Sequence, residues 1–116
     1  MKLLIVEDNA EMRRLITGLV RDIAETINEC SDGSQALAAY IEDQPDWVVM
    51  DIRMDLLDGI TATRKLIETF PEAQIVIISD FDDAKLRAAA SAAGACAYVM
   101  KEDLFVLRRI LGNGPR

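Results

Sequence analysis

Five polar side chains stand where short apolar runs of the sequence end. Glu7 and Asp8 follow the run LLIV, Asp51 follows WVVM, Ser79 follows IVII and Lys101 follows AYVM. The chain contains no histidine, so a histidine general base, a phosphohistidine and a histidine metal ligand are all excluded. Any chemistry must therefore use carboxylates, hydroxyls and lysine.

Three carboxylates in one place would need a cation. Two carboxylates about 4 Å apart repel each other by roughly 4 kcal/mol at an effective dielectric constant of about 20, and Lys101 alone cannot neutralise three of them. An oxygen-rich cluster without histidine or cysteine suits Mg²⁺, which keeps some of its waters and often bridges to a phosphate. A metal and a lysine beside an aspartate also suit phosphoryl transfer onto a carboxylate, with Asp51 as the candidate acceptor.

Each of these residues also has a purely structural interpretation. Acids that follow a strand often form turns or cap helices, and a single serine such as Ser79 is ordinary. Lys101, which precedes an acidic turn, would then form a surface ion pair of small value. Four separate strand ends of the same polar character nevertheless favour a shared site.

The elements that must position these side chains alternate along the chain. Short apolar runs alternate with longer segments of helical period, which is typical of βα units around a parallel sheet. In an open parallel sheet, sites form at the carboxyl ends of the strands, and right-handed crossovers place these ends at one edge. We therefore expect the polar residues to converge on one pocket. The predicted strands are 3–6, 26–30, 47–50, 75–78 and 97–100.

The first three predicted helices are marked by caps and breakers. The first follows Asn9 as N-cap, the second runs from about 34 to 41, and the third follows Asp58 as N-cap and ends before Pro71. Helical spacing predicts the buried faces of the first two. The expected buried residues are Met12, Leu15, Ile16, Leu19, Val20 and Ile23 in the first helix, and Ala36, Leu37, Tyr40 and Ile41 in the second.

The last two helices differ in what they can bury. The fourth, at about 84–93, is almost all alanine on its apolar side and ends at Gly94, so we expect it to shift most easily. The fifth, at about 103–111, has an apolar side, but Phe105 and Val106 point elsewhere. This spare apolar surface either reflects the single apolar residues that are common on protein surfaces or contacts a partner.

Composition limits the class of protein. The 116 residues are 51% hydrophobic, which is enough for one domain with a core. The net charge of -7 argues against direct nucleic-acid binding. The sequence has neither an apolar run of membrane-spanning length nor a signal peptide, so we expect a cytoplasmic protein without a membrane anchor. Cys30 and Cys96 are interpreted as structural, buried thiols.

Five segments together resemble the receiver domain of two-component response regulators. LLIVEDN, DWVVMDIRM followed by Asp58-Gly59, SDGSQAL, IVIIS and AYVMK fall in the family's order and at similar spacing. The resemblance covers residues 1–111 and leaves 112–116 as a linker-like tail. It implies a three-layer, flavodoxin-like α/β fold with a five-stranded parallel sheet in the order 2-1-3-4-5 and five helices.

The resemblance also implies roles for the polar residues. Asp51 would accept a phosphoryl group from the phosphohistidine of a sensor histidine kinase, and the chain would catalyse this reaction and its reversal by hydrolysis. Asp8, Asp51 and the backbone carbonyl of Arg53 would hold Mg²⁺, with Glu7 acting through water. Lys101 would pair with the phosphate.

Two further residues would act as a switch. By resemblance, Ser79 hydrogen-bonds a phosphoryl oxygen and draws its loop inward, and Tyr98 turns into the space that the loop vacates. The change would reach the face of the fourth and fifth helices. The added negative charge and acceptors need only favour one of two loop positions. The alternative for Tyr98 is a plain aromatic residue on a strand.

The chain departs from the family pattern at three places. Asp55 follows Met54 where proline is usual, which removes a fixed φ and adds a charge. Asp80 replaces a small residue after Ser79 and would repel an incoming phosphodonor. Glu102 replaces the frequent proline after the lysine, as in receivers attached to helix-turn-helix output domains. Glu102 therefore indicates a DNA-binding domain outside this chain as a partner. The spare apolar surface at Phe105 and Val106 indicates a homodimer formed on phosphorylation.

Three competing functions follow from the same residues. A phosphatase of the haloacid-dehalogenase type needs a second aspartate two positions after Asp51, where Arg53 stands. A flavodoxin needs a neutral phosphate loop where Glu7 and Asp8 lie. The serious alternative is a pseudo-receiver, an interaction module that is not phosphorylated, which only Asp55 and Asp80 favour.

Overall fold

The computed structural model describes residues 1–53 and 58–112. Within these residues, five parallel strands form one sheet in the order β2-β1-β3-β4-β5, which confirms the predicted fold class. Each strand lies within one residue of its predicted bounds. The strands are β1 (Lys2–Val6), β2 (Thr26–Cys30), β3 (Trp47–Asp51), β4 (Ile75–Ser79) and β5 (Ala97–Met100).

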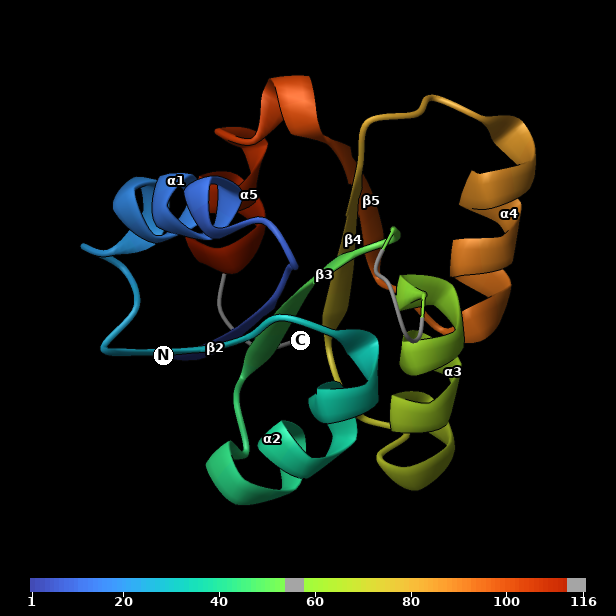
Figure 1. Ribbon diagram of the computed structural model, residues 1–116, viewed down its shortest axis with the longest axis horizontal. Coiled ribbons are helices and arrows are strands. Elements are labelled where there is room, and N and C mark those ends of the chain that lie inside the picture. The colour runs from blue at the N-terminus through green and yellow to red at the C-terminus, as the bar shows by residue number, and fades with distance from the viewer. Residues whose placement is uncertain (54–57, 113–116) are drawn as a thin grey trace.

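Helices cover both faces of this sheet. In Figure 1, α1 and α5 lie on one face, and α2, α3 and α4 lie on the other, so the molecule has three layers. Two short 3₁₀ turns, η1 (Gly33–Gln35) and η2 (Lys101–Asp103), follow β2 and β5. The helices are α1 (Ala10–Val20), α2 (Ala36–Asp43), α3 (Gly59–Thr69), α4 (Ala84–Ala93) and α5 (Val106–Gly112).

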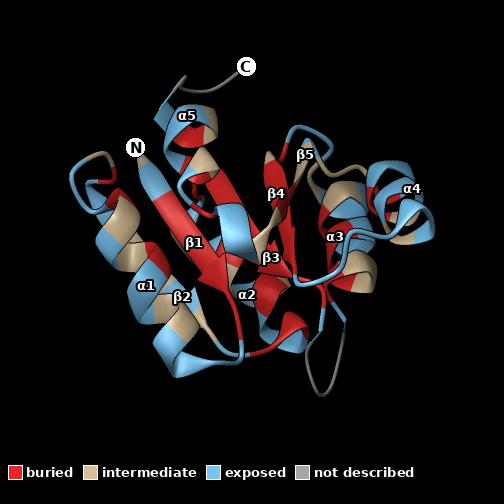
Figure 2. Cartoon of the chain, turned by 90° about the horizontal axis from the view of Figure 1, so that it is seen from above, coloured by how far each residue is buried: buried red, intermediate tan, exposed pale blue. Residues whose placement is uncertain are grey.

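Successive strand residues alternate between two apolar cores. Leu3 and Ile5 of β1 pack with the α1 and α5 side, whereas Leu4 and Val6 pack with the α2, α3 and α4 side. Because both faces of the sheet are covered, the central strands are buried along nearly their whole length, as Figure 2 shows, and nearly all of their side chains are apolar. The continuous apolar runs of the sequence have this physical cause.

The helix ends follow the local sequence. Asn9 and Asp58 cap α1 and α3, as predicted, and Asp83 caps α4 by accepting hydrogen bonds from two backbone amides. Gly94 ends α4 with φ of +108°, a conformation that side chains rarely adopt. Gly59 begins α3 so close to β3 that a Cβ atom there would overlap the carbonyl oxygen of Asp51.

Predictions about three helical side chains were wrong or incomplete. Leu15 and Ile41 are 51% and 53% exposed, because each lies at the margin of its helix rather than on the stripe that contacts the sheet. Helix α1 ends at Val20, so Ile23 packs against the core from the turn that follows. Helical spacing placed these side chains on a face that was broader than the real contact.

The start of the fifth helix was also predicted too early. Residues 101–103 form η2, and α5 begins only at Val106. Phe105 is 65% exposed, as expected, but Val106 is half-buried against the core. Cys96 is exposed, which contradicts its interpretation as a buried thiol.

The ends of the predicted domain are described only in part. Gly112 is the last residue of α5, and the rest of the expected tail, 113–116, lies outside the described residues. Among the described helices, none has the length and apolar character needed to cross a bilayer.

Candidate functional site

Three carboxylates meet at the carboxyl edge of the sheet. Oxygens of Glu7, Asp8 and Asp51 all lie within 4.8 Å of one another. The register of the adjacent strands explains this, since Val6 of β1 pairs with Met50 of β3 and the next residues come side by side. Glu7 and Asp51 are buried, whereas Asp8 is exposed. Residues that are far apart in the sequence therefore form one acidic cluster, as their strand-end positions predicted.

Lys101 lies directly on this cluster. Its Nζ atom is 3.1 Å from Glu7 Oε1 and 3.1 Å from Asp51 Oδ1. Burial lowers the pKa of Lys101, but the charges of Asp51 and Glu7 raise it, and the net pKa lies above its ordinary value. The ammonium group is therefore charged at neutral pH. It comes from η2, beyond β5, and reaches across the end of the sheet.

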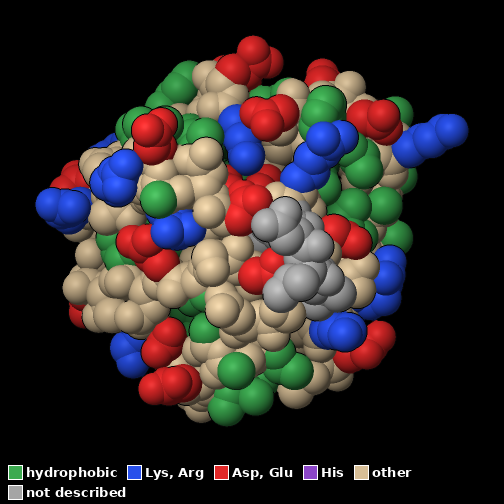
Figure 3. Space-filling model, in the orientation of Figure 1, with side chains coloured by type: hydrophobic (Ala, Val, Ile, Leu, Met, Phe, Trp, Pro, Cys, Tyr) green, Lys and Arg blue, Asp and Glu red, His purple; other side chains and the backbone are tan. Residues whose placement is uncertain are grey.

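The cluster keeps an excess of negative charge. Three carboxylates and one ammonium group leave a formal deficit of two positive charges. The pKa of Asp8 is raised above its ordinary value, first by a hydrogen bond with Glu7, then by burial and by the charge of Glu7. Carboxylate oxygens that repel one another in this way fit a hard divalent cation such as Mg²⁺. Figure 3 shows acidic side chains gathered near the centre of this face.

Ser79 and Tyr98 converge on the main chain of one residue, Phe81. Ser79 is buried at the end of β4, and its Oγ accepts a hydrogen bond of 3.0 Å from the Phe81 N–H. The Tyr98 hydroxyl donates a hydrogen bond of 2.7 Å to the Phe81 carbonyl oxygen. Arg87 of α4 places its guanidinium group 4.6 Å from the centre of the Tyr98 ring. The segment after β4 is thus bonded to both residues that were predicted to act as a switch.

Arg53 lies at the same edge, directly beyond β3. Its side chain is exposed, and its guanidinium group lies 4.4 Å from the centre of the Phe81 ring. The sequence predicted a binding role only for the backbone carbonyl of Arg53 and none for Phe81. No pattern in the sequence indicated this contact, which joins residues from the ends of two different strands. Met54 and Asp55, where the chain departs from the family pattern, lie outside the described residues.

A pocket of about 430 Å³ opens beside the acidic cluster. Asp80 and Lys101 line one part of it, and residues at the start of α1 line the rest. The exposed Leu15 forms part of this lining, which explains why it is not in the core. Asp80 is exposed and forms part of the pocket lining. The lining residues are Asn9, Glu11, Met12, Leu15, Asp80 and Lys101.

Comparisons with known proteins agree with this geometry. The family model of the response regulator receiver domain matches residues 3–110. The chemotaxis protein CheY of Bacillus subtilis is 37% identical over 101 residues, which cover 86% of this chain and 84% of CheY. An uncharacterized transcriptional regulatory protein of the same organism, YhcZ, is 33% identical over 119 residues, which cover 97% of this chain. The chain spans only 56% of YhcZ.

The fold comparison leads to the same family. The crystal structure of a two-component response regulator of the LuxR family from Aurantimonas sp. SI85-9A1 has a TM-score of 0.89 and 28% sequence identity. The similarity covers 97% of this chain and 82% of that one. The family match, the relatives and the shared fold lead to one conclusion: this chain belongs to the receiver domains of two-component response regulators.

Proposed function

We propose that this chain is a phosphoacceptor switch in which Asp51 takes a phosphoryl group from the phosphohistidine of a sensor histidine kinase. The P–N bond of the donor breaks as a bond forms between phosphorus and a carboxylate oxygen of Asp51. The observation that carries the proposal is the buried Asp51 carboxylate, 3.1 Å from the Lys101 ammonium group and beside two further acids. Positioning and charge neutralisation are the main requirements of such a transfer.

The acidic cluster is proposed to hold Mg²⁺. Asp8, Asp51 and the backbone carbonyl of Arg53 would be its ligands, and Glu7 would act through water. Bound Mg²⁺ would neutralise charge on the transferring phosphoryl group. The raised pKa of Asp8 and the close carboxylates of the cluster support this assignment, because both reflect charge that lacks a counterion.

Lys101 and Ser79 would receive the phosphoryl oxygens. The Lys101 ammonium group already contacts Asp51, so it can pair with the charge that phosphorylation brings. The Ser79 oxygen accepts from the Phe81 N–H, which leaves its hydroxyl hydrogen to donate to a phosphoryl oxygen. Because Tyr98 is bonded to the Phe81 carbonyl, a shift of this segment would reach Tyr98 and the face of α4 and α5.

The larger protein is proposed to be a transcription regulator. Residues 1–111 would form the receiver unit, 112–116 would begin a linker, and a DNA-binding output domain would lie outside this chain. The similarity to YhcZ, a transcriptional regulatory protein, and to the LuxR-family regulator supports this idea, as does the fact that the chain spans only 56% of YhcZ. The cytoplasm is the expected location, since the donor kinase presents its phosphohistidine there.

Incubation with acetyl phosphate and Mg²⁺, followed by intact mass measurement, tests the proposal. The wild type should gain the mass of one phosphoryl group, and Asp51→Asn should gain none. Asp103→Asn is the matched control, because it makes the same change at an exposed acid on η2. An unmodified wild type would instead support the pseudo-receiver alternative, which Asp80 at the pocket rim favours.

A second measurement tests association. Phe105 is 65% exposed, and its burial in a homodimer would be linked to phosphorylation. Sedimentation with beryllofluoride and Mg²⁺ should show a dimer that the untreated chain does not form. Identical monomeric sedimentation in both conditions would remove the dimer from the proposal.

A further inference from the structure

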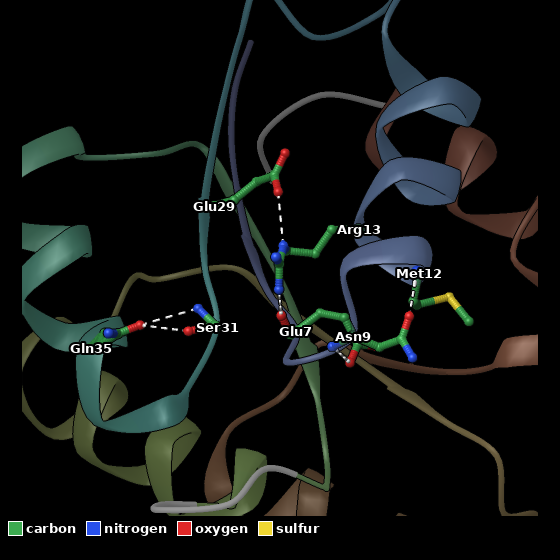
Figure 4. Close-up of polar contacts among 7 residues, drawn as sticks. All are labelled: Glu7, Asn9, Met12, Arg13, Glu29, Ser31 and Gln35. Carbon is green, nitrogen blue, oxygen red and sulfur yellow. Dashed lines mark hydrogen bonds and ion pairs between the residues drawn. The ribbon is translucent and has the colours of Figure 1, made fainter.

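Arg13 of α1 connects two segments that are separate in the sequence. Its Nη1 donates a hydrogen bond of 2.6 Å to the backbone carbonyl of Glu7, and its Nε donates one of 2.9 Å to Oε1 of Glu29. Glu29 belongs to β2, the strand next to β1. Figure 4 shows the guanidinium group between these two acceptors. Arg13 therefore ties the segment that carries Glu7 and Asp8 to the neighbouring strand.

The backbone of Glu7 is held on both sides. Its N–H donates a hydrogen bond of 3.0 Å to the carbonyl of Cys30, and its carbonyl accepts the bond from Arg13. The Glu7 side chain in turn accepts a hydrogen bond of 3.2 Å from the N–H of Asn9. The peptide groups on either side of Glu7 are thus fixed by contacts from β2 and α1, and the amide that follows Asp8 is held by the Glu7 side chain. Hydrogen bonds from a charged donor are about twice as strong as neutral ones, so the Arg13 contact is a substantial part of this arrangement.

Glu29 determines where the charge of Arg13 lies. An exposed ion pair alone contributes little to stability, and Glu29 is 41% exposed at its side chain. The pair matters because it neutralises the guanidinium group while that group donates to the backbone carbonyl of Glu7. The carboxylates of Glu7 and Asp51 are paired instead with Lys101. If the guanidinium group lost Glu29 and paired with these carboxylates, it would compete with a divalent ion for the same oxygens.

We propose that Arg13 is a positioning residue for the divalent-cation site and that Glu29 keeps it in its place. Arg13 holds the Glu7 peptide so that the carboxylates of Glu7 and Asp8 face the cation, without contacting the cation itself. Groups that orient ligands from outside the coordination shell commonly contribute about 10- to 100-fold to metal affinity. The inference rests on the proposed function in one respect, since it takes Mg²⁺ to be the ion that the cluster holds.

Calorimetric titration with Mg²⁺ tests the role of Arg13. Arg13→Ala should bind Mg²⁺ about tenfold more weakly than the wild type. Arg13→Lys should recover part of the loss, because an ammonium group keeps the charge but cannot bridge both acceptors in the same planar geometry. Arg14→Ala, an equal loss of charge at the exposed neighbouring position, should change the affinity less than twofold. If Arg13 acted only through its charge, Arg13→Ala would bind Mg²⁺ more tightly than the wild type, because removal of a positive charge strengthens cation binding.

The role of Glu29 has its own variant. Glu29→Gln should weaken Mg²⁺ binding several-fold, because the freed guanidinium group then competes for the carboxylates. In the Arg13→Ala background the same change should have little effect, since no guanidinium group remains to be released. If the losses of Mg²⁺ affinity in the two single variants add up in the double variant, Glu29 does not act by keeping Arg13 in place.

Amide hydrogen exchange in EDTA provides a readout that needs no metal. The Asn9 amide, bonded to the Glu7 side chain, should exchange several-fold faster in Arg13→Ala than in the wild type, with the amides of α5 unchanged. Unchanged Asn9 exchange, or equal Mg²⁺ affinities of wild type and Arg13→Ala, would overturn this inference and leave the proposed function intact. A wild type that binds no Mg²⁺ would overturn both.

Discussion

The α4 and α5 regions are held to the rest of the molecule by different contacts. The α5 region buries Leu104, Leu107 and Leu111 in the core, whereas α4 buries only Ala90 and Ala93 completely. Figure 2 shows the contrast, with most of α4 exposed. Because the stabilisation from burial grows with apolar area, α5 is anchored much more strongly than α4. This difference agrees with the weak anchoring that the alanine-rich sequence of α4 predicted.

Polar contacts repeat the same division. Arg108 of α5 donates to both carboxylate oxygens of Asp22, at 2.6 and 3.0 Å, and also to the carbonyl of Leu19, which joins α5 to α1. On the α4 side, Arg87 contacts the Tyr98 ring and pairs with Asp82, so its partners lie next to the proposed switch. The strongly anchored pair α1 and α5 can serve as a frame, and the lightly anchored α4 can change position against it.

The largest expected effect compares one leucine from each region. Leu107→Ala should lower the free energy of unfolding by about 2–5 kcal/mol, because it leaves a cavity in a fully buried site. Leu86→Ala, the matched change on α4, should cost about 1 kcal/mol or less, since Leu86 is only half-buried. Urea denaturation measures both. Equal losses in the two variants would break the comparison.

A smaller, local effect is expected at Tyr98. Tyr98→Phe removes the hydrogen bond to the Phe81 carbonyl, which contributes about 1 kcal/mol. Hydrogen exchange should become faster at the first amides of α4 and stay unchanged in α5. Tyr40→Phe removes the same atom from the other tyrosine, on α2, and should leave α4 unchanged. Faster exchange in both helices after Tyr98→Phe would show that α4 does not move separately.

The smallest effect on stability is expected at Asp8, which lies at the carboxyl edge of the sheet between the two helical layers. The pKa of Asp8 is raised in the folded state above its ordinary value of 3.8, so its contribution favours folding below that pH and is lost as pH rises through the raised pKa. In EDTA, Asp8→Asn should therefore match the wild type near pH 4 and become more stable than it towards pH 7.

The gain should stay under about 1 kcal/mol, because Asp8 is exposed and solvent screens its charge. Thermal melts at both pH values measure it, and Asp103→Asn is the control for an exposed acid outside the cluster. Millimolar Mg²⁺ should remove the advantage of Asp8→Asn by stabilising only the wild type. A variant less stable than the wild type at pH 7 in EDTA would contradict the repulsion.

Sequence reasoning predicted the sheet and the acidic cluster well for one physical reason. Strands buried on both faces must be apolar along their length, so Val6, Met50 and Ile78 identify their strands directly. Parallel topology then places the residues that follow them at one edge. The meeting of Glu7 with Asp51 needs no information beyond this.

Helical periodicity was less informative because it gives the direction of a face but not its width. Leu15 and Ile41 fit the pattern of buried positions, yet both are exposed. The width of the contact depends on how closely the helix approaches the sheet and on which neighbours flank it. Leu15 lines a pocket beside the proposed site instead of contacting the sheet.

The sequence alone determined the order of strands and helices, the composition of the acidic edge and the small side chains of α4. Only the tertiary structure placed Arg13 between Glu7 and Glu29, and brought Ser79 and Tyr98 to the main chain of Phe81. No local sequence pattern marks the residues that form these contacts as partners of one another. Local patterns report burial, which depends on each residue's own polarity, whereas such contacts depend on the spatial arrangement of elements that are distant in the chain.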